Sequence, residues 1–472
     1  MSDVPRHVHF VAIGGTGMGS LAGLLKARGI YVTGSDANVY PPMSTLLEGW
    51  GIPVMAGFRE EHIDSETDLV VIGNAVRPNN VEARAAIDAG HRYLSFPAAL
   101  YELAIAQKHS VVISGTHGKT TTTSLVGSLL LGTGADPSLL VGGHSYDFEG
   151  SFREGEGKHF VVEGDEYDTA FFDKTPKFLH YGARTLLVSS VEFDHADIYR
   201  DIDHIKEAFR KLVAQMPPDG KIVAAVDHAA VRDVVSGAPC AVVGYGSSKR
   251  ADWRAQSVRA GPEGTHFEIV IGGADPVPAL VPLFGAFNIE NALGALAIVS
   301  ALDVPLREAI RSLSTFRGVK RRQEIRGRAA GVTVIDDFAH HPTAVRGSIA
   351  ATRDRFSDSR VIAVFEPRTN TSRRAIFQSD YVRALEGADR VFVRKLAEDP
   401  IYSATGPVTE RFSTDRLVAD LEARGVPALC LSEIDEIVSQ LARQSRPGDV
   451  VLCMSNGSFD NIWQRLLDAL GG

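Results

Sequence analysis

The sequence has 472 residues, which at about 150 residues per domain predicts about three domains. Hydrophobic residues make up 44% and charged residues 23% of it, as in ordinary globular proteins, so a disordered tail, a collagen-like fibre and a small disulfide-stabilised protein are excluded. The 58 acidic residues outnumber the 49 lysines and arginines, and the net charge of −9 argues against a dedicated nucleic-acid-binding protein.

The sequence shows no sign of export or membrane insertion. The first 15 residues lack the positive start, long apolar stretch and cleavage site of a signal peptide. The longest apolar-rich stretch, 292–301, is shorter than the roughly 18 residues expected of a membrane span. The three cysteines are far apart in the sequence, as expected of free thiols in a reducing compartment. We therefore expect a cytoplasmic protein without membrane contact.

Strands and helices alternate at the start of the chain, up to roughly residue 106. Residues 8–13 and 31–33 are rich in β-forming side chains, and a helix-like stretch at 20–27 separates them. A further strand at 69–72 precedes a helix at 81–89. This alternation predicts a parallel, doubly wound sheet.

The first of these strands ends in a glycine-rich loop, Gly14-Gly15-Thr16-Gly17-Met18-Gly19. Glycines let the backbone approach a diphosphate, and the N–H groups at a helix start favour an anion. The spacing approximates G-x-G-x-x-G, and Asp36 lies near the end of the second strand. By itself the loop fits NAD, a nucleotide sugar or a tight turn without a ligand.

A second strand–loop–helix unit carries the most informative motif, Gly115-Thr116-His117-Gly118-Lys119-Thr120-Thr121. In a phosphate-binding loop the backbone amides wrap the phosphates of ATP, Lys119 neutralises β- and γ-phosphate oxygens, and the Thr120 hydroxyl binds Mg²⁺. Ile113 replaces the first glycine of the usual pattern, and a structural turn is the alternative. The position of the loop between a strand and a helix favours a nucleotide.

Further strands are expected in this unit at 160–162, 186–188 and 222–226. Residues 252–281 differ, because short alternating runs broken by glycine and proline predict antiparallel hairpins. A helix at 289–302 closes the region.

A third alternating region begins near residue 317, with strands expected at 332–335, 361–365, 391–393 and 450–454. The chain therefore contains three successive α/β units, with boundaries near residues 106 and 317.

Polar side chains follow neighbouring strands of the second unit. Glu163 begins the run Glu163-Gly164-Asp165-Glu166, and Asp194-His195 follows the next strand. Each taken alone also fits a helix cap, a surface charge or a hydrogen-bonded histidine. Carboxylate oxygens suit Mg²⁺, and the ends of parallel strands share one edge of a sheet. We therefore expect Glu163 and His195 to lie near Lys119-Thr120.

The third unit holds the cluster Asp336-Asp337-Phe338-Ala339-His340-His341-Pro342. Adjacent histidines project differently, so they are not expected to share a metal without further ligands. One of them could serve in acid–base catalysis near neutral pH, and a helix-start turn capped by aspartate is the alternative. Arg321-Arg322 and the segment 366–370 supply forked donors suited to phosphate or carboxylate.

In this order the motifs resemble the Mur ligase family, the ATP-dependent amide-bond ligases of bacterial cell-wall synthesis. The resemblance covers essentially the whole chain and includes F-N-I-E-N at 287–291 and K-R-R at 320–322. The strings at 34–46, 166–174, 191–199, 366–371 and 454–459 look like the branch that joins UDP-N-acetylmuramate to L-alanyl-γ-D-glutamyl-meso-diaminopimelate in cell-wall recycling. The alternative is the sister branch that adds L-alanine to the same sugar nucleotide.

The resemblance implies an α/β fold of three domains. These are a UDP-sugar-binding Rossmann-like domain at 1–106, a central P-loop ATPase-like domain at 107–317 that binds ATP, and a Rossmann-like C-terminal domain at 318–472 that receives the peptide. It implies ATP and Mg²⁺ as cofactors and UDP-N-acetylmuramate and the murein tripeptide as partners, with neither nucleic acid nor membrane. The oligomeric state does not follow from the sequence.

The resemblance also implies roles for individual residues. The UDP diphosphate is expected on Gly15, Thr16, Gly17, Met18 and Asp36. ATP is expected on the loop 115–121, on Asn288 and Asn291 beside adenine, and on Arg322 and Asp337. Mg²⁺ is expected on Thr120, Glu163 and His195, and the peptide on Arg368, Asn370, Ser455 and Asn456. Lys119, His195, Arg322, Asp337 and His341 form the expected catalytic set, in which His341 or Asp337 assists deprotonation of the amine.

Two functions of other classes remain as alternatives. An NAD-dependent oxidoreductase built on the first glycine loop leaves the motif at 115–121 unexplained. A non-catalytic nucleotide-dependent binding module would keep that motif without chemistry.

Overall fold

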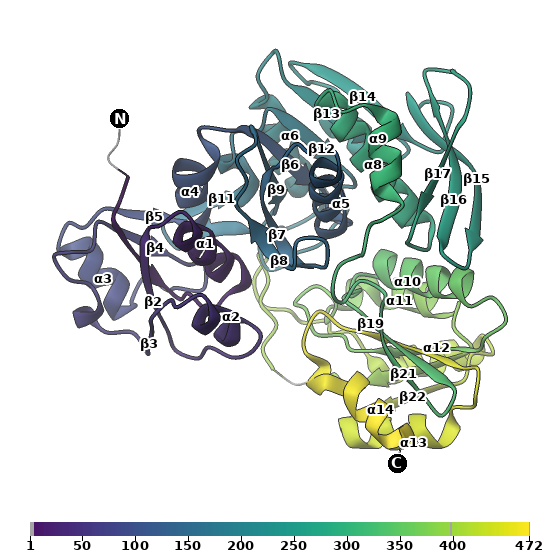
Figure 1. The fold of residues 1–472 in the computed structure, drawn as a ribbon. Helices are drawn as coiled ribbons and strands as arrows, with labels where there is room; N and C mark the ends of the chain where they lie inside the picture. Colours follow the sequence, from purple (N-terminus) through teal and green to yellow (C-terminus); the bar gives the residue numbers. More distant parts are fainter. Residues whose placement is uncertain (1–3, 397–398, 472) are drawn as a thin grey trace.

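The computed structural model describes residues 4–396 and 399–471, which form three α/β units, each built on its own main sheet (Figure 1). The predicted fold class is confirmed. Among the described residues, none of the helices combines the length and apolar character needed to span a bilayer.

The N-terminal unit contains a five-stranded parallel sheet in the order β3-β2-β1-β4-β5. Its strands are β1 (His7–Val11), β2 (Tyr31–Asp36), β3 (Val54–Ala56), β4 (Leu69–Ile72) and β5 (Tyr93–Ser95). Its helices are α1 (Thr16–Ala27), α2 (Met43–Gly49), α3 (Val81–Asp88) and α4 (Phe96–Leu100), with short turns η1 (Glu60–His62) and η2 (Tyr101–Ile105). The strand order reverses between β1 and β4, and ligands bind at such a switch point in open α/β sheets.

The central unit contains a ten-stranded sheet in the order β17-β16-β15-β14-β13-β12-β6-β9-β7-β8. Its strands are β6 (His109–Ser114), β7 (Ser138–Ser145), β8 (Gly150–Arg153), β9 (His159–Gly164), β12 (Thr185–Val188), β13 (Lys221–Ala225), β14 (Ala241–Gly246), β15 (Trp253–Gly261), β16 (Gly264–Ile271) and β17 (Val277–Val281). Its helices are α5 (Lys119–Gly132), α6 (Ile202–Ala214), α7 (Ala229–Val235), α8 (Ala286–Ala301) and α9 (Leu306–Leu313), beside the hairpin β10 (Asp168–Ala170)–β11 (Asp173–Pro176) and the turn η3 (Lys177–His180).

Strands β6, β9 and β12 are parallel neighbours at the middle of the central sheet, so the prediction that their carboxyl ends share one edge is confirmed. The antiparallel hairpins expected at 252–281 are β15, β16 and β17, and β15 continues the parallel part of the sheet beside β14. The apolar helices α5 and α8 pack together over this sheet, and their buried side chains belong to one hydrophobic core.

The C-terminal unit contains a six-stranded sheet in the order β18-β19-β23-β20-β21-β22, parallel except for β18. Its strands are β18 (Glu324–Ala329), β19 (Val332–Asp337), β20 (Val361–Phe365), β21 (Arg390–Arg394), β22 (Ala428–Leu431) and β23 (Val450–Met454). Its helices are α10 (Pro342–Arg355), α11 (Gln378–Leu385), α12 (Thr414–Ala423), α13 (Ile434–Gln444) and α14 (Ile462–Gly471), with turns η4 (Ala375–Phe377) and η5 (Phe459–Asn461).

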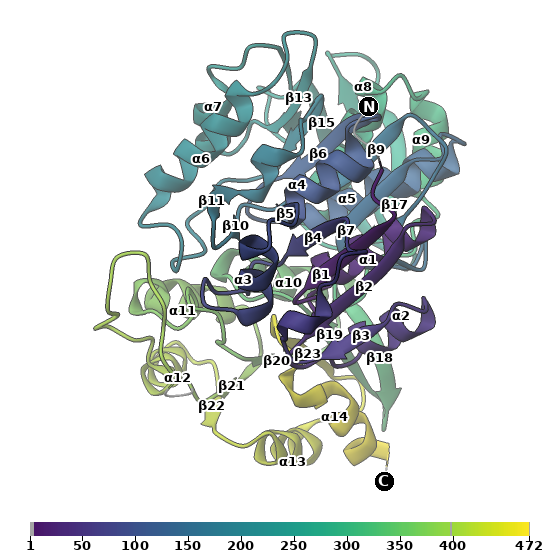
Figure 2. The same cartoon turned by 90° about the vertical axis from the view of Figure 1, so that its left-hand side faces the viewer.

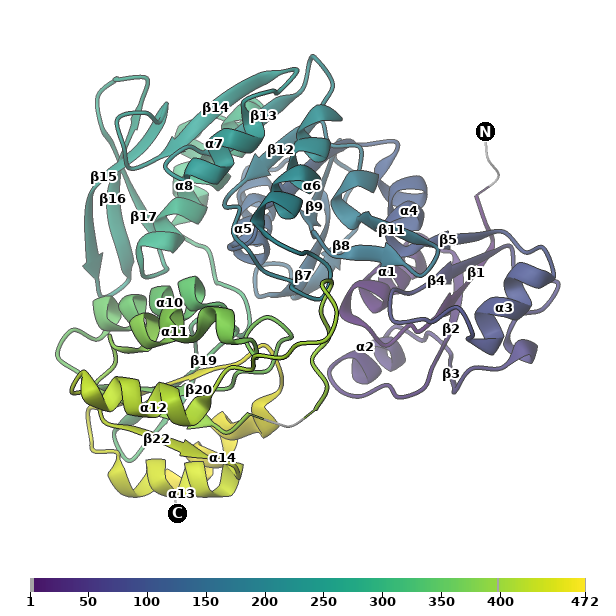
Figure 3. The ribbon, with the colours of Figure 1, turned by 180° about the vertical axis from the view of Figure 1, so that it is seen from behind.

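The outer units both contact the central one, as the side and rear views show (Figures 2 and 3). Helix α1 packs on β7 and β8, where Ser20 Oγ lies 2.6 Å from Ser151 Oγ and Arg28 forms an ion pair with Glu154 at 3.0 Å. On the other side, α10 packs against α8 and β15. The Ala404 N–H donates to Ala196 O at 3.0 Å, which adds a second contact of the C-terminal unit.

Several element ends differ from prediction, including the start of α1 at Thr16 instead of residue 20 and the end of β2 at Asp36 instead of residue 33, and two of the differences have a backbone cause. Strand β1 ends at Val11 instead of Ile13 because Ala12 takes a left-handed conformation, with φ of 67°. Helix α8 begins at Ala286, three residues earlier than predicted, because Gly285 with φ of 89° turns the chain into the helix.

Candidate functional site

The three units surround one large cavity of about 1950 Å³. The first glycine loop, the loop 116–121 and segments 319–323 and 336–341 line it. Most of the predicted site residues lie on its wall: Gly15, Thr16, Gly17, Met18, Asp36, Thr116, His117, Gly118, Lys119, Thr120, Thr121, Glu163, His195, Asn288, Asn291, Arg322, Asp337, His341, Arg368 and Asn456. Gly115, Asn370 and Ser455 are not among the lining residues, and each contacts other protein groups.

The first glycine loop is closed by Asp36, whose Oδ2 accepts from the Gly14 N–H at 2.8 Å. Gly15 precedes α1 in extended backbone, and no side chain of the described residues caps this helix. The N–H groups of the first turn at Thr16 and Gly17 therefore suit an anionic group in the cavity.

The loop 115–118 joins β6 to α5 and depends on two glycines. Gly118 has φ of 80°, and a Cβ there would lie 2.3 Å from Asn291 Oδ1. Gly115 has φ of 135°, and a Cβ there would lie 2.1 Å from Ser189 Oγ. The His117 N–H also donates to Ser190 Oγ at 2.9 Å. Ser189 and Ser190, which follow β12, thus pack against the loop and support it. The loop therefore has its shape before any ligand binds.

Lys119 is held by a buried carboxylate that the sequence interpretation did not include in the site. Its Nζ lies 2.6 Å from Glu166 Oε2 and donates to Gly115 O at 2.8 Å. Burial alone would lower the pKa of Lys119, but the charges of Glu166 and Asp165 raise it, so the ammonium group stays charged. Glu166 is the last residue of the run 163–166, which was the available signal in the sequence.

The same carboxylate holds His195. The Nε2 of His195 lies 2.9 Å from Glu166 Oε1, and Asp194 Oδ1 accepts from the His195 N–H at 2.7 Å. Burial opposes protonation of the imidazole, but Asp194 and Glu166 outweigh it and raise the pKa of His195 to about 9. The imidazole is therefore protonated at neutral pH in the free protein.

The raised pKa of His195 predicts how stability depends on pH. The folded protein binds a proton on His195 up to about pH 9, whereas an unfolded histidine releases it near 6.5. The stabilisation is fully present below about pH 6.5 and is lost as pH rises through 9, on the order of 3 kcal/mol in all. Denaturant unfolding between pH 6 and about 9.5 should show this decline in the wild type and a much flatter profile in His195→Gln. Parallel pH profiles of the wild type and His195→Gln would contradict this prediction.

Two predicted magnesium ligands are in direct contact. The Thr120 hydroxyl donates to Glu163 Oε1 at 3.1 Å, and the Gly142 N–H donates to Glu163 Oε2 at 2.7 Å. Burial raises the pKa of Glu163, although Lys119 and Arg322 oppose the shift. A buried carboxylate beside a hydroxyl fits Mg²⁺, because this hard cation prefers oxygen ligands and would favour the ionised acid. His195, the third predicted ligand, faces Glu166 in this structure.

Arg322 reaches from the C-terminal side of the cavity to this pair. Its Nη2 donates to Thr120 Oγ1 at 3.1 Å, and its guanidinium group stacks 4.9 Å from the Phe338 ring centre. Burial lowers the pKa of Arg322, whereas Asp337 and Glu163 raise it. Arg322 stays charged nonetheless, because an arginine keeps its proton in proteins.

Asp337 and the two asparagines are occupied by protein contacts. Asp337 accepts from Ala339 N at 2.7 Å and from Gln323 N at 2.9 Å, so its carboxylate holds a turn. Asn291 Nδ2 donates to Asn288 Oδ1 at 3.2 Å, and Asn288 Nδ2 donates to Phe284 O at 2.8 Å. All three side chains are buried.

His341 precedes α10, and its Nδ1 accepts the Thr343 N–H at 3.3 Å. Burial and the neighbouring His117 lower the pKa of His341 to about 4, against the opposite influence of Asp194. The imidazole is therefore neutral at pH 7. Residues 338–341 accordingly form a turn between β19 and α10, so a helix start follows the motif as one alternative predicted, but the capping side chain is that of His341 and not an aspartate.

The predicted peptide residues separate into two groups. Arg368 is exposed on the cavity wall, and Asn456 Oδ1 is a buried atom with no hydrogen-bond partner within the described parts of the chain. Ser455 Oγ instead donates to Glu366 at 2.5 Å, and Asn370 Oδ1 accepts from Tyr402 N at 3.1 Å. Arg368 and Asn456 are thus the predicted peptide residues that line the cavity, and the Asn456 amide oxygen is unpaired among the described residues.

The cavity also has cationic groups that were not predicted as site residues. Lys320, Arg321 and Arg326 lie on its wall beside Arg322. The K-R-R string at 320–322 was the signal for the first two. These positive groups offset the negative net charge of the chain where anionic ligands would meet.

Comparison with known proteins finds the same family over all three units. The models for the Mur ligase family catalytic domain, the Mur ligase middle domain and the Mur ligase glutamate ligase domain match residues 7–108, 113–299 and 321–457. The chain is 38% identical to the UDP-N-acetylmuramate–L-alanyl-γ-D-glutamyl-meso-2,6-diaminoheptandioate ligase of Escherichia coli K12, over 98% of each chain. It is 31% identical to the UDP-N-acetylmuramate–L-alanine ligase of Clostridium tetani, over 96% of each. The crystal structure of a murein peptide ligase from Psychrobacter arcticus superposes with a TM-score of 0.72 at 32% identity, over 99% of each.

Proposed function

This chain belongs to the Mur ligase family, and on that premise we propose that it joins UDP-N-acetylmuramate to the tripeptide L-alanyl-γ-D-glutamyl-meso-diaminopimelate with consumption of ATP. The higher identity to the E. coli tripeptide ligase than to the L-alanine ligase, over nearly the full length of both, supports this choice of acceptor.

One observation carries the reaction class: on the wall of the shared cavity, Arg322 of the C-terminal unit reaches the hydroxyl of Thr120, which follows Lys119 in the phosphate loop of the central unit. A free carboxylate does not acylate an amine at neutral pH, because oxide would have to leave. Transfer of the γ-phosphoryl group of ATP to the sugar-borne carboxylate gives an acyl phosphate, from which phosphate leaves readily. The two anions repel each other by several kcal/mol (order of magnitude) at a partly desolvated site, and cationic side chains offset this repulsion.

The residues divide this work as follows. The backbone of the loop 115–118 and Lys119 would hold the phosphates, and Arg322 would stabilise charge on the transferring group. Thr120 and Glu163 would hold Mg²⁺, with His195 as the proposed third ligand, and the ion would neutralise phosphate charge. The first glycine loop would hold the diphosphate of the sugar nucleotide.

The amine must attack in its neutral form. His341 is the better candidate to accept its proton, because both oxygens of Asp337 accept backbone hydrogen bonds and the His341 imidazole is neutral. Enclosure of the cavity by three units would keep water from the acyl phosphate.

The test of this function is ATP consumption by the purified protein with UDP-N-acetylmuramate and a panel of amines. We expect phosphate release with the diaminopimelate tripeptide and little with L-alanine alone. Preference for L-alanine would assign the chain to the sister activity, and turnover without an amine would contradict ligation.

Asn456→Ala is expected to raise the KM for the tripeptide about tenfold, because Asn456 lines the cavity on the proposed acceptor side and its amide oxygen has no hydrogen-bond partner among the described residues. The KM for ATP should not change. Initial rates with one substrate varied at a time measure both. Gln464→Ala is the control, because that side chain is not among the cavity-lining residues and donates to Asp468 on the surface of α14. An unchanged tripeptide KM in Asn456→Ala would remove this residue from the acceptor site.

A further inference from the structure

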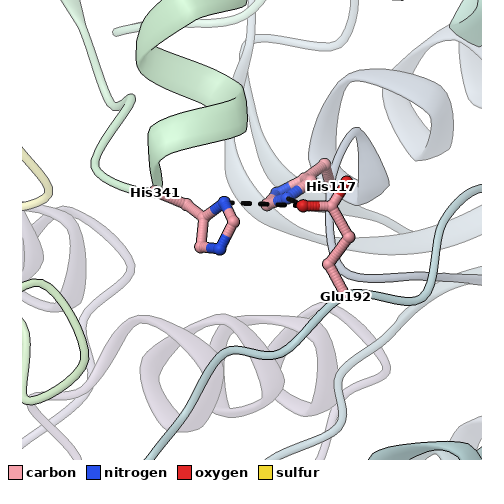
Figure 4. A group of neighbouring side chains, drawn as sticks. All are labelled: His117, Glu192 and His341. Carbon is pink, nitrogen blue, oxygen red and sulfur yellow. Dashed lines mark hydrogen bonds and ion pairs between the residues drawn. The ribbon is translucent and has the colours of Figure 1, made fainter. Parts of the chain in front are cut away.

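Three metal-binding side chains from separate segments face one another at the junction of the central and C-terminal units (Figure 4). His117 belongs to the phosphate loop, Glu192 follows β12 and His341 precedes α10. Glu192 Oε2 lies 3.4 Å from His117 Nε2 and 3.7 Å from His341 Nδ1. All three potential ligand atoms lie within 4.8 Å of one another.

These separations are close to those of a tetrahedral metal site. Zinc–nitrogen and zinc–oxygen bonds of about 2.0–2.1 Å place neighbouring ligand atoms about 3.3 Å apart. The two separations from Glu192 Oε2, 3.4 Å and 3.7 Å, therefore need only small adjustments, whereas the two imidazole nitrogens, which lie within 4.8 Å of each other, would have to move closer together. The side chain of His117 is partly exposed, at 23%, and has room to rotate.

Hydrogen bonds around the cluster already orient its ligand atoms. The His341 Nε2–H donates to Phe193 O at 3.3 Å, which leaves Nδ1, 3.7 Å from Glu192 Oε2, as the unprotonated nitrogen. The Thr343 hydroxyl donates to Glu192 Oε2 at 2.7 Å. Contacts of this kind fix the tautomer and orientation of metal ligands. The Thr343 N–H that donates to His341 Nδ1 does so at 3.3 Å, a long hydrogen bond that a metal could displace.

We propose that His117, Glu192 and His341 bind a divalent transition-metal ion such as Zn²⁺, at a site separate from the Thr120–Glu163 pair. Two imidazoles and one carboxylate suit Zn²⁺, Co²⁺ or Ni²⁺, whereas Mg²⁺ prefers oxygen ligands alone. The neighbouring His340 takes no part, because its Nε2 faces Asp194 at 3.8 Å. The fourth coordination position would open to the cavity, which all three ligand residues line.

The bound ion would connect two units of the fold. His117 and Glu192 belong to the central unit and His341 to the C-terminal unit, so one ion would hold the two together. It would also occupy the His341 nitrogen that is proposed to accept the proton of the amine. Transition metals are therefore expected to inhibit magnesium-supported turnover.

The test uses the metal-free full-length protein and needs no turnover. Zn²⁺ titration against a chromophoric chelator should show one tight site per chain, and Co²⁺ should give the visible absorption of a tetrahedral complex. Loss of an outer hydrogen bond weakens metal sites about 10- to 100-fold, so loss of a ligand should weaken this one by about 100-fold or more. His117→Gln and His341→Asn are the ligand variants. Asparagine at position 341 can still cap α10, which preserves the fold.

His340→Gln is the matched control, because it removes the adjacent imidazole and leaves the three ligands in place. We expect it to bind Zn²⁺ and Co²⁺ as the wild type does. The proposal would be overturned if the wild type bound no Zn²⁺ tightly, or if His117→Gln and His341→Asn bound it with wild-type affinity. Weakening in His340→Gln equal to that in the ligand variants would overturn it as well.

Discussion

Lys119→Ala is expected to lower ATP turnover in the presence of both co-substrates at least about a hundred- to a thousandfold, the usual cost of removing one preorganised group that stabilises transferring charge. Its ammonium group lies at the start of α5 and stays charged through its contact with Glu166. Formation of the proposed acyl phosphate is the step that we expect to fail. Phosphate release and ADP formation with UDP-N-acetylmuramate and tripeptide measure the effect.

Binding of the sugar nucleotide provides the control for Lys119→Ala. UDP-N-acetylmuramate is proposed to bind at the first glycine loop, so its Kd by calorimetry should remain within about twofold of the wild type. Lys211→Ala is the matched surface variant, because Lys211 is exposed on α6 and pairs only with Glu207 among the described residues. Loss of sugar-nucleotide binding with phosphate transfer preserved would contradict the assignment. Thermal unfolding of Lys119→Ala separates this effect from destabilisation by a Glu166 that has lost one of its two cationic partners and keeps His195.

Arg322→Met is the second change with a large expected effect. Methionine keeps much of the apolar stem but removes the guanidinium group that reaches Thr120 Oγ1 at 3.1 Å. We expect kcat to fall about a hundred- to a thousandfold, with a smaller change in the KM for ATP, because the charge is proposed to act mainly in the transition state. Steady-state kinetics at saturating co-substrates give both parameters.

Arg328→Met is the control for this variant, because Arg328 is an exposed arginine on β18. It should retain wild-type kcat and KM. Arg322→Lys should recover only part of the activity, since a lysine lacks the planar fork of donors. A kcat for Arg322→Met within about threefold of the wild type would show that the charge is not used in phosphoryl transfer.

The sequence could predict the fold class and the meeting of Lys119, Glu163 and His195 at one sheet edge, because both follow from local pattern and from parallel topology. Strand β7 was missed, since its sequence SLLVGGHS contains two adjacent glycines that weaken a strand signal. The predicted end of β1 is two residues too late. The positive φ of Ala12 ends the strand, but it is imposed by the tertiary structure and the sequence pattern gives no signal for it.

The partners of the site residues could not be predicted in the same way. Whether Glu166 or Asp165 faces Lys119 depends on how the chain turns after β9, and the structure selects Glu166. Likewise, the approach of Glu192 to His341 joins residues 149 positions apart, at 3.7 Å, and only the packing of two units creates it. For Asp337 the motif predicts a carboxylate that acts in the site. In the structure this carboxylate already accepts hydrogen bonds from two backbone N–H groups.

The contacts of α1 with β7 and β8 have a consequence for the order of events in the ligase. The Ser20–Ser151 hydrogen bond and the Arg28–Glu154 ion pair fasten the first glycine loop to the sheet that carries the phosphate loop. A sugar acid docked on one would already be aimed at the phosphoryl donor on the other. Activation of that acid then needs little rearrangement of these two units. The larger movement is the one that brings the amine to the activated acid.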